Sequence, residues 1–244
     1  MSTESVLRHM DEIVDVYCKA NRYQQEELTP GRARTFVKQH RLNTRQRNSV
    51  LKLRVATNTT DWDTKMRIIH ACSQELIADN EFANSKPHWR ILEELGETIG
   101  MKHDEIVNAK PLPSTEIAWA AWEGLMSNKH WLLGIVANAC AERANVPGYG
   151  TGAAREHGNS WVQGKRWEKL FGLKGDQLEF FHVHSVADID HSNLAWQAVA
   201  ENAEKLGMED EVEHACAVNL QVWTLYWHGI CDEGARLDAS RQAA

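Results

Sequence analysis

Cysteine is scarce in this chain and forms none of the usual metal-binding patterns. The five cysteines lie far apart, and no two of them form a CxxC pair. This spacing excludes a zinc ribbon and argues against a disulfide scaffold, so we expect a reducing, cytoplasmic environment. The sequence also lacks an apolar run of about 18 residues and an apolar block after a basic N-terminus. We therefore expect a soluble protein without a membrane anchor.

An excess of positive charge is also missing. Lysine and arginine total 27 against 34 aspartates and glutamates, which gives a net charge of −7. Proteins that bind nucleic acid usually present a basic surface, and this composition offers none. Basic residues do gather at positions 31–47, but acidic segments surround them, so we interpret them as a solvated helix face. A small molecule is the expected partner.

The two-residue alternation of strands is almost absent, and apolar residues recur at helical spacing along most of the chain. The predicted helices cover about residues 4–25, 36–55 with an interruption, 62–82, 87–100, 114–126, 128–144, 161–171, 179–196 and 209–238. With 43% hydrophobic residues, the 244-residue chain can bury a sizeable core. We expect an all-α protein with a single domain that spans residues 1–244.

Glycine and proline gather in one long segment, residues 145–160, which contains four of the 15 glycines. The segment lacks the lysine and hydroxyl of the GxxxxGK[ST] motif and follows a helical pattern instead of a strand. These features exclude a phosphate-binding loop. A plain connector and a lid over a pocket both fit the composition.

The most informative stretch is HSVADIDH, residues 184–191. His184, Asp188 and His191 fall at about 0°, 40° and −20° on a helix, which places them on one narrow stripe. Two imidazoles and a carboxylate suit a divalent transition-metal ion. Apolar neighbours such as Phe180 and Phe181 indicate a buried helix, where unpaired charge is costly. The stretch predicts part of a metal site, and a structural role for the histidines is the alternative.

Earlier segments offer candidate partners for this stripe. Glu142 extends the mainly apolar face of WLLGIVANACAE, although it could also mark the solvent end of that helix. Glu81 and His88 lie on either side of a predicted helix break, which lets both side chains turn toward one centre. Three carboxylates and three imidazoles can hold two iron ions and leave positions open for O2.

NEFANSKPH, Glu142 and HSVADIDH together resemble the ligand pattern of the haem-oxygenase-like diiron oxidases and oxygenases. This superfamily is related in fold to haem oxygenase, thiaminase II and the oxidase of PQQ synthesis. The resemblance implies one bundle of about seven or eight helices and an oxidoreductase with O2 as co-substrate. It implies oxidation of a small metabolite in biosynthesis, such as an amino acid or a fatty acid, by N-oxygenation, desaturation or oxidative C–C cleavage. We expect an amino acid or related carboxylic acid as the substrate. It implies two Fe(II) ions held by Glu81, His88, Glu142, His184, Asp188 and His191.

Other functions fit the residues less well. A ferritin-like diiron bundle needs ExxH on two helices, and only Glu211 and His214 offer it. Haem oxygenase would use an axial histidine such as His9, but it gives the carboxylates no role. A thiaminase-type hydrolase would need a nucleophilic cysteine, for which Cys140 or Cys72 is available. A metal-free hydrolase or binding protein on the same scaffold therefore stays open as the alternative.

No motif identifies the substrate. Arg143, Arg155 and Lys165 are candidate clamps for a substrate carboxylate, although surface arginines are commoner than clamps. The oligomeric state is open as well, and a homodimer is the commonest closed assembly.

Overall fold

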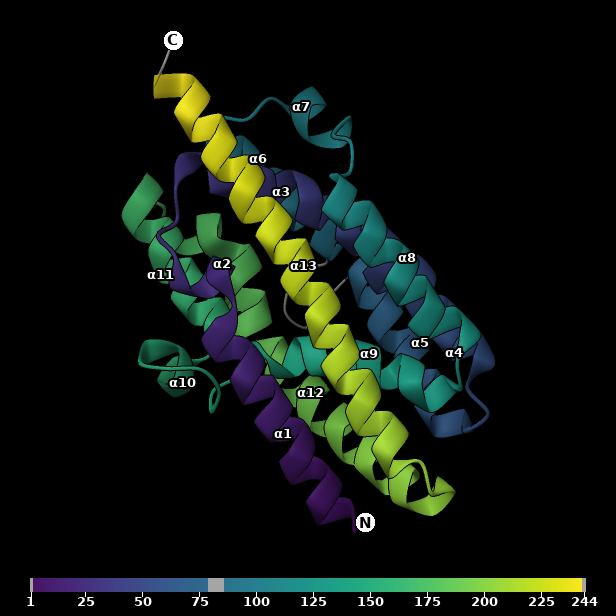
Figure 1. Cartoon of the computed structure of the whole chain (residues 1–244). Coiled ribbons are helices and arrows are strands. Elements are labelled where there is room, and N and C mark those ends of the chain that lie inside the picture. The colour runs from purple at the N-terminus through teal and green to yellow at the C-terminus, as the bar shows by residue number, and fades with distance from the viewer. Residues whose placement is uncertain (1, 79–85, 243–244) are drawn as a thin grey trace.

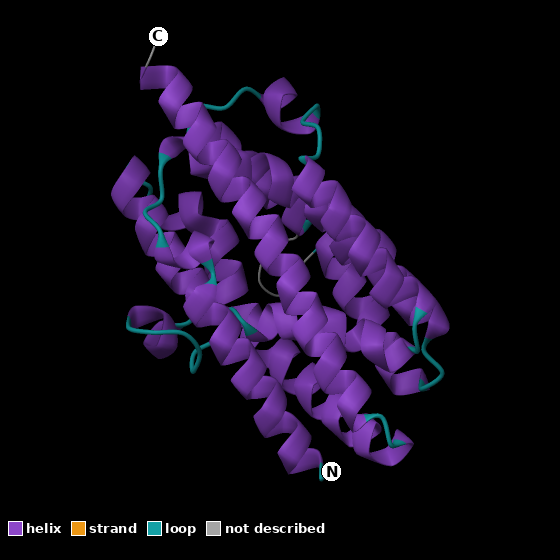
Figure 2. Cartoon of the chain, in the orientation of Figure 1, coloured by secondary structure: helices purple, strands orange, loops and turns teal. Residues whose placement is uncertain are grey.

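All regular structure in the described part of the chain is helical (Figure 2). The computed structural model describes residues 2–78 and 86–242, apart from the side chains of four residues in the twelfth helix, Ala187, Asp190, His191 and Leu194. The described helices are α1 (Thr3–Ala20), α2 (Arg22–Gln25), α3 (Pro30–Arg45), the π-helix η1 (Gln46–Leu51), α4 (Lys52–Asn58), α5 (Trp62–Leu76), α6 (His88–Thr98), α7 (His103–Val107), α8 (Pro113–Asn128), α9 (Trp131–Arg143), α10 (Ala153–His157), α11 (Asn159–Phe171), the 3-10 helix η2 (Gly175–Leu178), α12 (Glu179–Leu206) and α13 (Glu209–Gln242).

The predicted all-α class is confirmed, but the helices outnumber the seven or eight expected. The additional helices include α2, α7 and α10, which have only four or five residues each. A segment this short completes little more than one turn, so it shows no apolar periodicity in the sequence. Residues 145–160, predicted to be irregular, contain one of these short helices, α10.

The longest helix, α13, runs diagonally across the bundle and packs against α1, α3, α8 and α9 (Figure 1). It approaches α3 closely because glycines lie at the crossing. A Cβ atom on Gly31 would lie 2.2 Å from the carbonyl oxygen of Gly234. The Gly31 N–H also donates a hydrogen bond of 2.7 Å to Asp238 Oδ1. The second long helix, α12, packs against α1, α9 and α11.

Side-chain caps determine where the helices that carry the site begin. Pro30 opens α3, and the Thr29 hydroxyl accepts a hydrogen bond from the Arg32 N–H. The break near Pro30 therefore precedes this helix. The Asp61 carboxylate caps α5 by accepting a bond of 2.8 Å from the Thr64 N–H. Both arrangements follow the preference for oxygen-bearing side chains at helix N-termini.

The interruption predicted within residues 36–55 is the π-helix η1, which joins α3 to α4. A π-turn breaks the regular ladder of α-helical hydrogen bonds and often occurs at a functional site. Here the Ser49 hydroxyl donates to the Thr44 carbonyl at 2.9 Å and so satisfies one displaced acceptor. Arg47, Asn48 and Lys52, within or directly after η1, line a cavity described below.

The core is rich in tryptophan and contains a buried ion pair. Trp122, Trp167 and Trp196 are fully buried. Arg41 Nε lies 2.6 Å from Glu93 Oε1, which links α3 to α6 inside the bundle. The described helices include none with the length and apolar character needed to cross a bilayer.

Candidate metal centre

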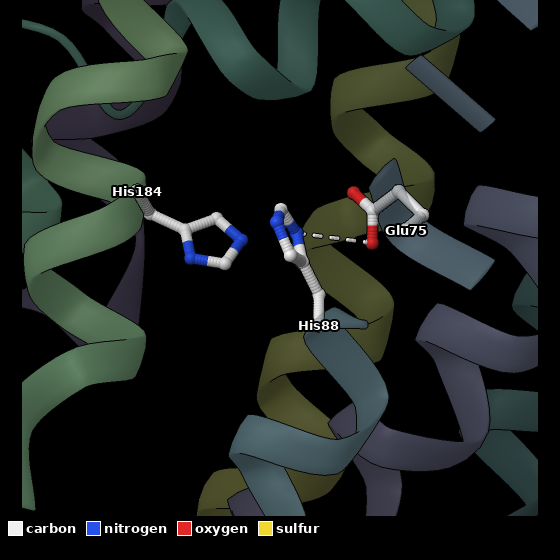
Figure 3. A group of neighbouring side chains, drawn as sticks. All are labelled: Glu75, His88 and His184. Atoms are coloured by element: carbon white, nitrogen blue, oxygen red, sulfur yellow. Dashed lines mark ion pairs between the residues drawn. The ribbon is translucent and has the colours of Figure 1, made fainter. Parts of the chain in front are cut away.

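Three side chains from three helices converge on one point (Figure 3). Glu75 lies in the last turn of α5, His88 is the first residue of α6, and His184 lies in the first half of α12. One ligand atom from each lies within 4.8 Å of the others. His88 Nδ1 is 3.3 Å from Glu75 Oε2, and the two imidazole centroids are 4.9 Å apart. We call these three residues the triad.

His184 has the ring orientation and protonation state that a metal ligand needs. Its Nδ1 lies 2.7 Å from the Phe180 carbonyl oxygen. Because a carbonyl only accepts, Nδ1 carries the proton and Nε2 is the ligand atom. Burial, with a smaller contribution from the neighbouring His88, lowers the pKa of His184 to about 4. The ring is therefore neutral at pH 7, as metal binding requires.

Glu75 is ionised at pH 7 although only 9% of its surface is exposed. Burial raises the pKa of this carboxyl group, but the charges of His88 and Lys52 outweigh burial and hold the pKa at about 2. Apart from the ion pair with His88, Oε2 accepts no hydrogen bond from the described residues. A buried anionic oxygen without a hydrogen bond is costly, and a bound cation would satisfy it.

Two further carboxylates lie close to the triad. Lys52 Nζ and Asn138 Nδ2 approach the same oxygen of Glu142, Oε1, at 3.3 and 2.9 Å. Asn145 Nδ2 donates to Asp188 Oδ2 at 2.9 Å. Burial raises the pKa of Asp188 well above its usual value, and the charge of Glu142 raises it further. This environment favours protonated Asp188, so a cation that binds there would release a proton.

The triad, Glu142 and Asp188 line one cavity of about 110 Å³, which we call the inner cavity. Its walls also carry the rings of His40, Phe180, Trp223 and Trp227. A water molecule needs roughly 10–15 Å³ of such space, so several waters or ions fit. The volume is well below the roughly 300 Å³ at which pockets for organic ligands begin. The inner cavity therefore suits ions and very small molecules.

Four of the six predicted ligands line the inner cavity, namely His88, Glu142, His184 and Asp188. Glu81 lies outside the described residues, and so does the side chain of His191, whose backbone is part of α12. Glu75 was missed by the sequence analysis. Ile68, Cys72 and Glu75 repeat the spacing of the His184 stripe, so an acidic residue at the end of an apolar stripe was the available signal.

Cations also line the inner cavity, but they are Arg47 and Lys52 rather than the candidate clamps. Arg47 is 2% exposed, and burial lowers its pKa to about 10. The candidate clamps Arg143, Arg155 and Lys165 each pair with an acidic side chain elsewhere. The π-helix η1 thus contributes a positive charge that the sequence pattern did not reveal.

Comparison with known protein families indicates which metal ion this site would bind. The family model described as "iron-containing redox enzyme" matches residues 34–224, most of the chain, including the triad and both further carboxylates. The chain belongs to this family of iron-containing redox enzymes. Membership of this family shows, at the level of the family, that the protein is a redox enzyme. It also makes iron the metal to test at this site.

A solved structure supports the same fold for this iron-containing redox enzyme. It is the crystal structure of a domain of unknown function with a heme oxygenase-like fold from Shewanella denitrificans. The TM-score is 0.70 at 15% identity, over 99% of this chain and 94% of that chain. At this identity the likeness shows the fold alone, and the predicted haem-oxygenase-like superfamily is confirmed. No curated protein sequence matches the chain.

The residues of this iron-containing redox enzyme fit iron ions better than a haem. Two imidazoles and a carboxylate form a common ligand set for non-haem iron, and Glu75 Oε2 accepts no hydrogen bond from the part of the chain that the structure describes, apart from its ion pair with His88. A haem is an organic group far larger than the 110 Å³ of the inner cavity. His9, the histidine available to the haem alternative, lies 2.9 Å from Glu213 and does not line this cavity.

The cysteines of this iron-containing redox enzyme do not favour a thiaminase-type mechanism. Cys72 and Cys140 are both buried, and burial raises the pKa of Cys72 to about 11. Asn219 Nδ2 donates a hydrogen bond to Cys140 Sγ at 2.7 Å. Nucleophilic attack requires a thiolate, which the raised pKa of Cys72 disfavours, and neither cysteine lines the inner cavity. Glu211 and His214, the single ferritin-like pair, are exposed on α13.

Proposed function

We propose that this protein is a non-haem diiron enzyme that uses O2 to oxidise a small organic acid or amino acid. The observation that carries the proposal is the convergence of five cation-binding side chains on one cavity with room for ions and little else. Membership of the iron-containing redox enzymes supports iron as the metal. The diiron count, the use of O2 and the small-molecule substrate belong to the proposal.

The chain provides two groups of ligands. The triad would hold one iron ion, and Glu142 with Asp188 would hold the other. The resemblance to haem-oxygenase-like diiron enzymes adds Glu81 and His191 to these groups. Two iron ions, when bound, would supply the electrons that reduce dioxygen.

The surrounding residues position these ligands and control their protons. Lys52 and Asn138 hold one oxygen of Glu142, so the other oxygen can bind a cation. The Phe180 carbonyl fixes the proton of His184 on Nδ1. Positioning contacts of this kind typically change metal affinity about 10–100-fold when they are removed.

The first experiment measures bound iron after anaerobic loading with Fe(II) and removal of excess metal. We expect about two iron ions per chain in the wild type and fewer in His184→Ala, because one group loses an imidazole. His214→Ala, which removes an exposed histidine from α13, is the matched control and should bind as the wild type does. Circular dichroism checks that both variants fold. Wild-type iron content in a folded His184→Ala protein would reject the site.

A second pair of variants tests which glutamate completes the first group. Glu75→Gln keeps the size of the side chain but removes the charge that faces His88. We expect it to lose iron, and Glu81→Gln measures the contribution implied by the resemblance. If Glu75→Gln retains all its iron while Glu81→Gln loses it, Glu75 is not a ligand.

An O2-dependent absorbance transient after mixing the iron-loaded protein with oxygenated buffer tests the redox step. The metal-free hydrolase or binding protein is the alternative outcome. It would be supported if the wild type bound no iron under any loading condition and still folded normally. In that case Lys52 would be the permanent partner of Glu142.

A further inference from the structure

A second cavity lies beside the inner one, between α5 and the helices α4, α9 and α12. We call it the side cavity. Its volume is about 490 Å³, against about 110 Å³ for the inner cavity. Only the larger volume falls within the range of about 300–1,000 Å³ that is typical of pockets for small organic ligands. Most of its wall is aliphatic, with Val55, Met66, Ile68, Ile135, Ala195 and Ala198.

The space stays open because of how α5 packs and what faces it. α5 packs mainly against α4, η1 and α6. Across the cavity, α9 contributes Gly134, and α12 contributes Ala195 and Ala198. Protein interiors are close-packed and rarely leave a void of this size, and larger side chains at these positions would fill it. The open space therefore follows directly from small residues on two helices.

The two ends of the side cavity differ in exposure and charge. At the inner end, Lys52, Asn138 and Glu142 line both cavities, so the side cavity reaches the candidate metal ligands. At the outer rim, Met66 and Arg67 are exposed on α5. The side cavity thus extends from the molecular surface to the carboxylate of Glu142.

Charge determines which end can accept an anion. Lys52 already lies 3.3 Å from Glu142, and a second carboxylate placed there would be repelled by the first. Arg67 forms no ion pair with the described residues, and at the surface its partner would stay partly hydrated. A negative group is therefore better placed at Arg67, with an apolar chain pointing inward.

We propose that the side cavity binds the substrate, an aliphatic monocarboxylic acid, with its carboxylate at Arg67 and its chain extending to Glu142. The role of this acid as a substrate rests on the proposed function, but its binding in the side cavity needs no metal. Aliphatic walls favour a hydrocarbon chain through removal of apolar surface from water. An α-amino acid in this pose would place its ammonium group beside Arg67, where like charges repel. The proposal therefore narrows the substrate class to acids with an apolar chain.

The test measures binding of decanoate to the metal-free protein by titration calorimetry. Ala198→Trp fills the side cavity, and Ala195→Leu fills it less and guards against misfolding of the first variant. Ala235→Trp, at an exposed position of α13, is the matched control. We expect decanoate to bind to the wild type and the control, and Ala198→Trp to weaken binding about tenfold or more. Arg67→Met should weaken it about two- to fivefold and leave binding of decanol unchanged.

The outcomes separate this proposal from the proposed function. Lack of decanoate binding by the wild type, or equal binding by both filled variants and the control, overturns the side-cavity proposal whatever the iron content. Decanoate binding without any iron binding would keep the side-cavity ligand and reject the diiron enzyme. Equal weakening of decanoate and decanol by Arg67→Met would overturn the placement of the carboxylate.

Discussion

The metal-free protein should lose stability steeply as the pH falls from 6.5 to 4.5. Two histidines at the inner cavity are the cause. Burial, with smaller contributions from nearby His184 and Arg47, lowers the pKa of His40 to about 3. The pKa of His184 is about 4. His40 stacks on Phe36 with ring centroids 4.9 Å apart, and its Nδ1 lies 3.2 Å from the Tyr226 hydroxyl oxygen.

The sign and size of the effect follow from proton linkage. An unfolded histidine has a pKa of about 6.5, so the unfolded chain takes up protons first as the pH falls. The free energy of unfolding is therefore highest above about pH 6.5, and each histidine removes about 1.4 kcal/mol per pH unit below that value. Both together remove up to about 5 kcal/mol by pH 4.5, and Asp188, whose raised pKa acts in the opposite direction, returns up to about half of that loss. Domains of this kind have a total of only about 5–15 kcal/mol, so the loss is large.

The assay is urea unfolding followed by tryptophan fluorescence at half-unit steps from pH 7 to pH 4.5. His40→Phe keeps an aromatic ring against Phe36 but cannot take up a proton. It should be less stable at pH 7, because the Tyr226 hydroxyl loses its partner. Between pH 6.5 and 4.5 its loss of stability should be smaller than that of the wild type by up to about 2.7 kcal/mol, the contribution of one histidine. His214→Phe, on an exposed face of α13, is the control that should keep the wild-type loss.

One result would refute this reasoning. If His40→Phe and the wild type lost equal free energy of unfolding across the same pH range, His40 would not be held neutral in the folded state. The inner cavity would then be wet enough to hydrate an imidazolium ion.

Three further predictions concern single contacts. Arg41→Met should lower the free energy of unfolding by about 2–3 kcal/mol, less than for a fully unpaired buried charge because Arg90 still pairs with Glu93 at 3.0 Å, while Arg41→Met with Glu93→Leu should recover most of the loss in urea titrations. Lys52→Met should weaken iron binding about 10–100-fold in chelator competition, because Glu142 loses one of two contacts on Oε1. Gly31→Val should destabilise the protein by about 1–3 kcal/mol or more in thermal unfolding, because its Cβ would meet a backbone carbonyl of α13 at 2.2 Å.

Periodicity was enough to predict the fold class and the longer helices. It found α12 because the apolar residues around His184 continue for many turns. It missed α7 and α10 because helices of five residues show no repeat, and it continued the first helix through α2 without the break at Asn21. The π-helix η1 was seen only as an interruption, since its hydrogen bonds depend on a register that the sequence does not display.

The sequence predicted the candidate site only where several potential metal ligands occur together on an otherwise apolar helix. His184 and Asp188 stood out for that reason, and both line the inner cavity. Glu75 did not, because one carboxylate after Ile68 and Cys72 is also typical of a stripe that reaches solvent. The side cavity could not be predicted at all. It depends on the distance between α5 and α12, which no local pattern encodes.

The π-helix η1 also limits how far the length of this segment can change without damage to the protein. Each residue turns an α-helix by about 100°, so deletion of one residue from Gln46–Leu51 would rotate every side chain of α4 about its axis. Lys52 would then point away from Glu142, and Val55 would leave the wall of the side cavity. Insertions and deletions should therefore be far more damaging here than in the glycine-rich segment at residues 145–160, whatever residues they add or remove.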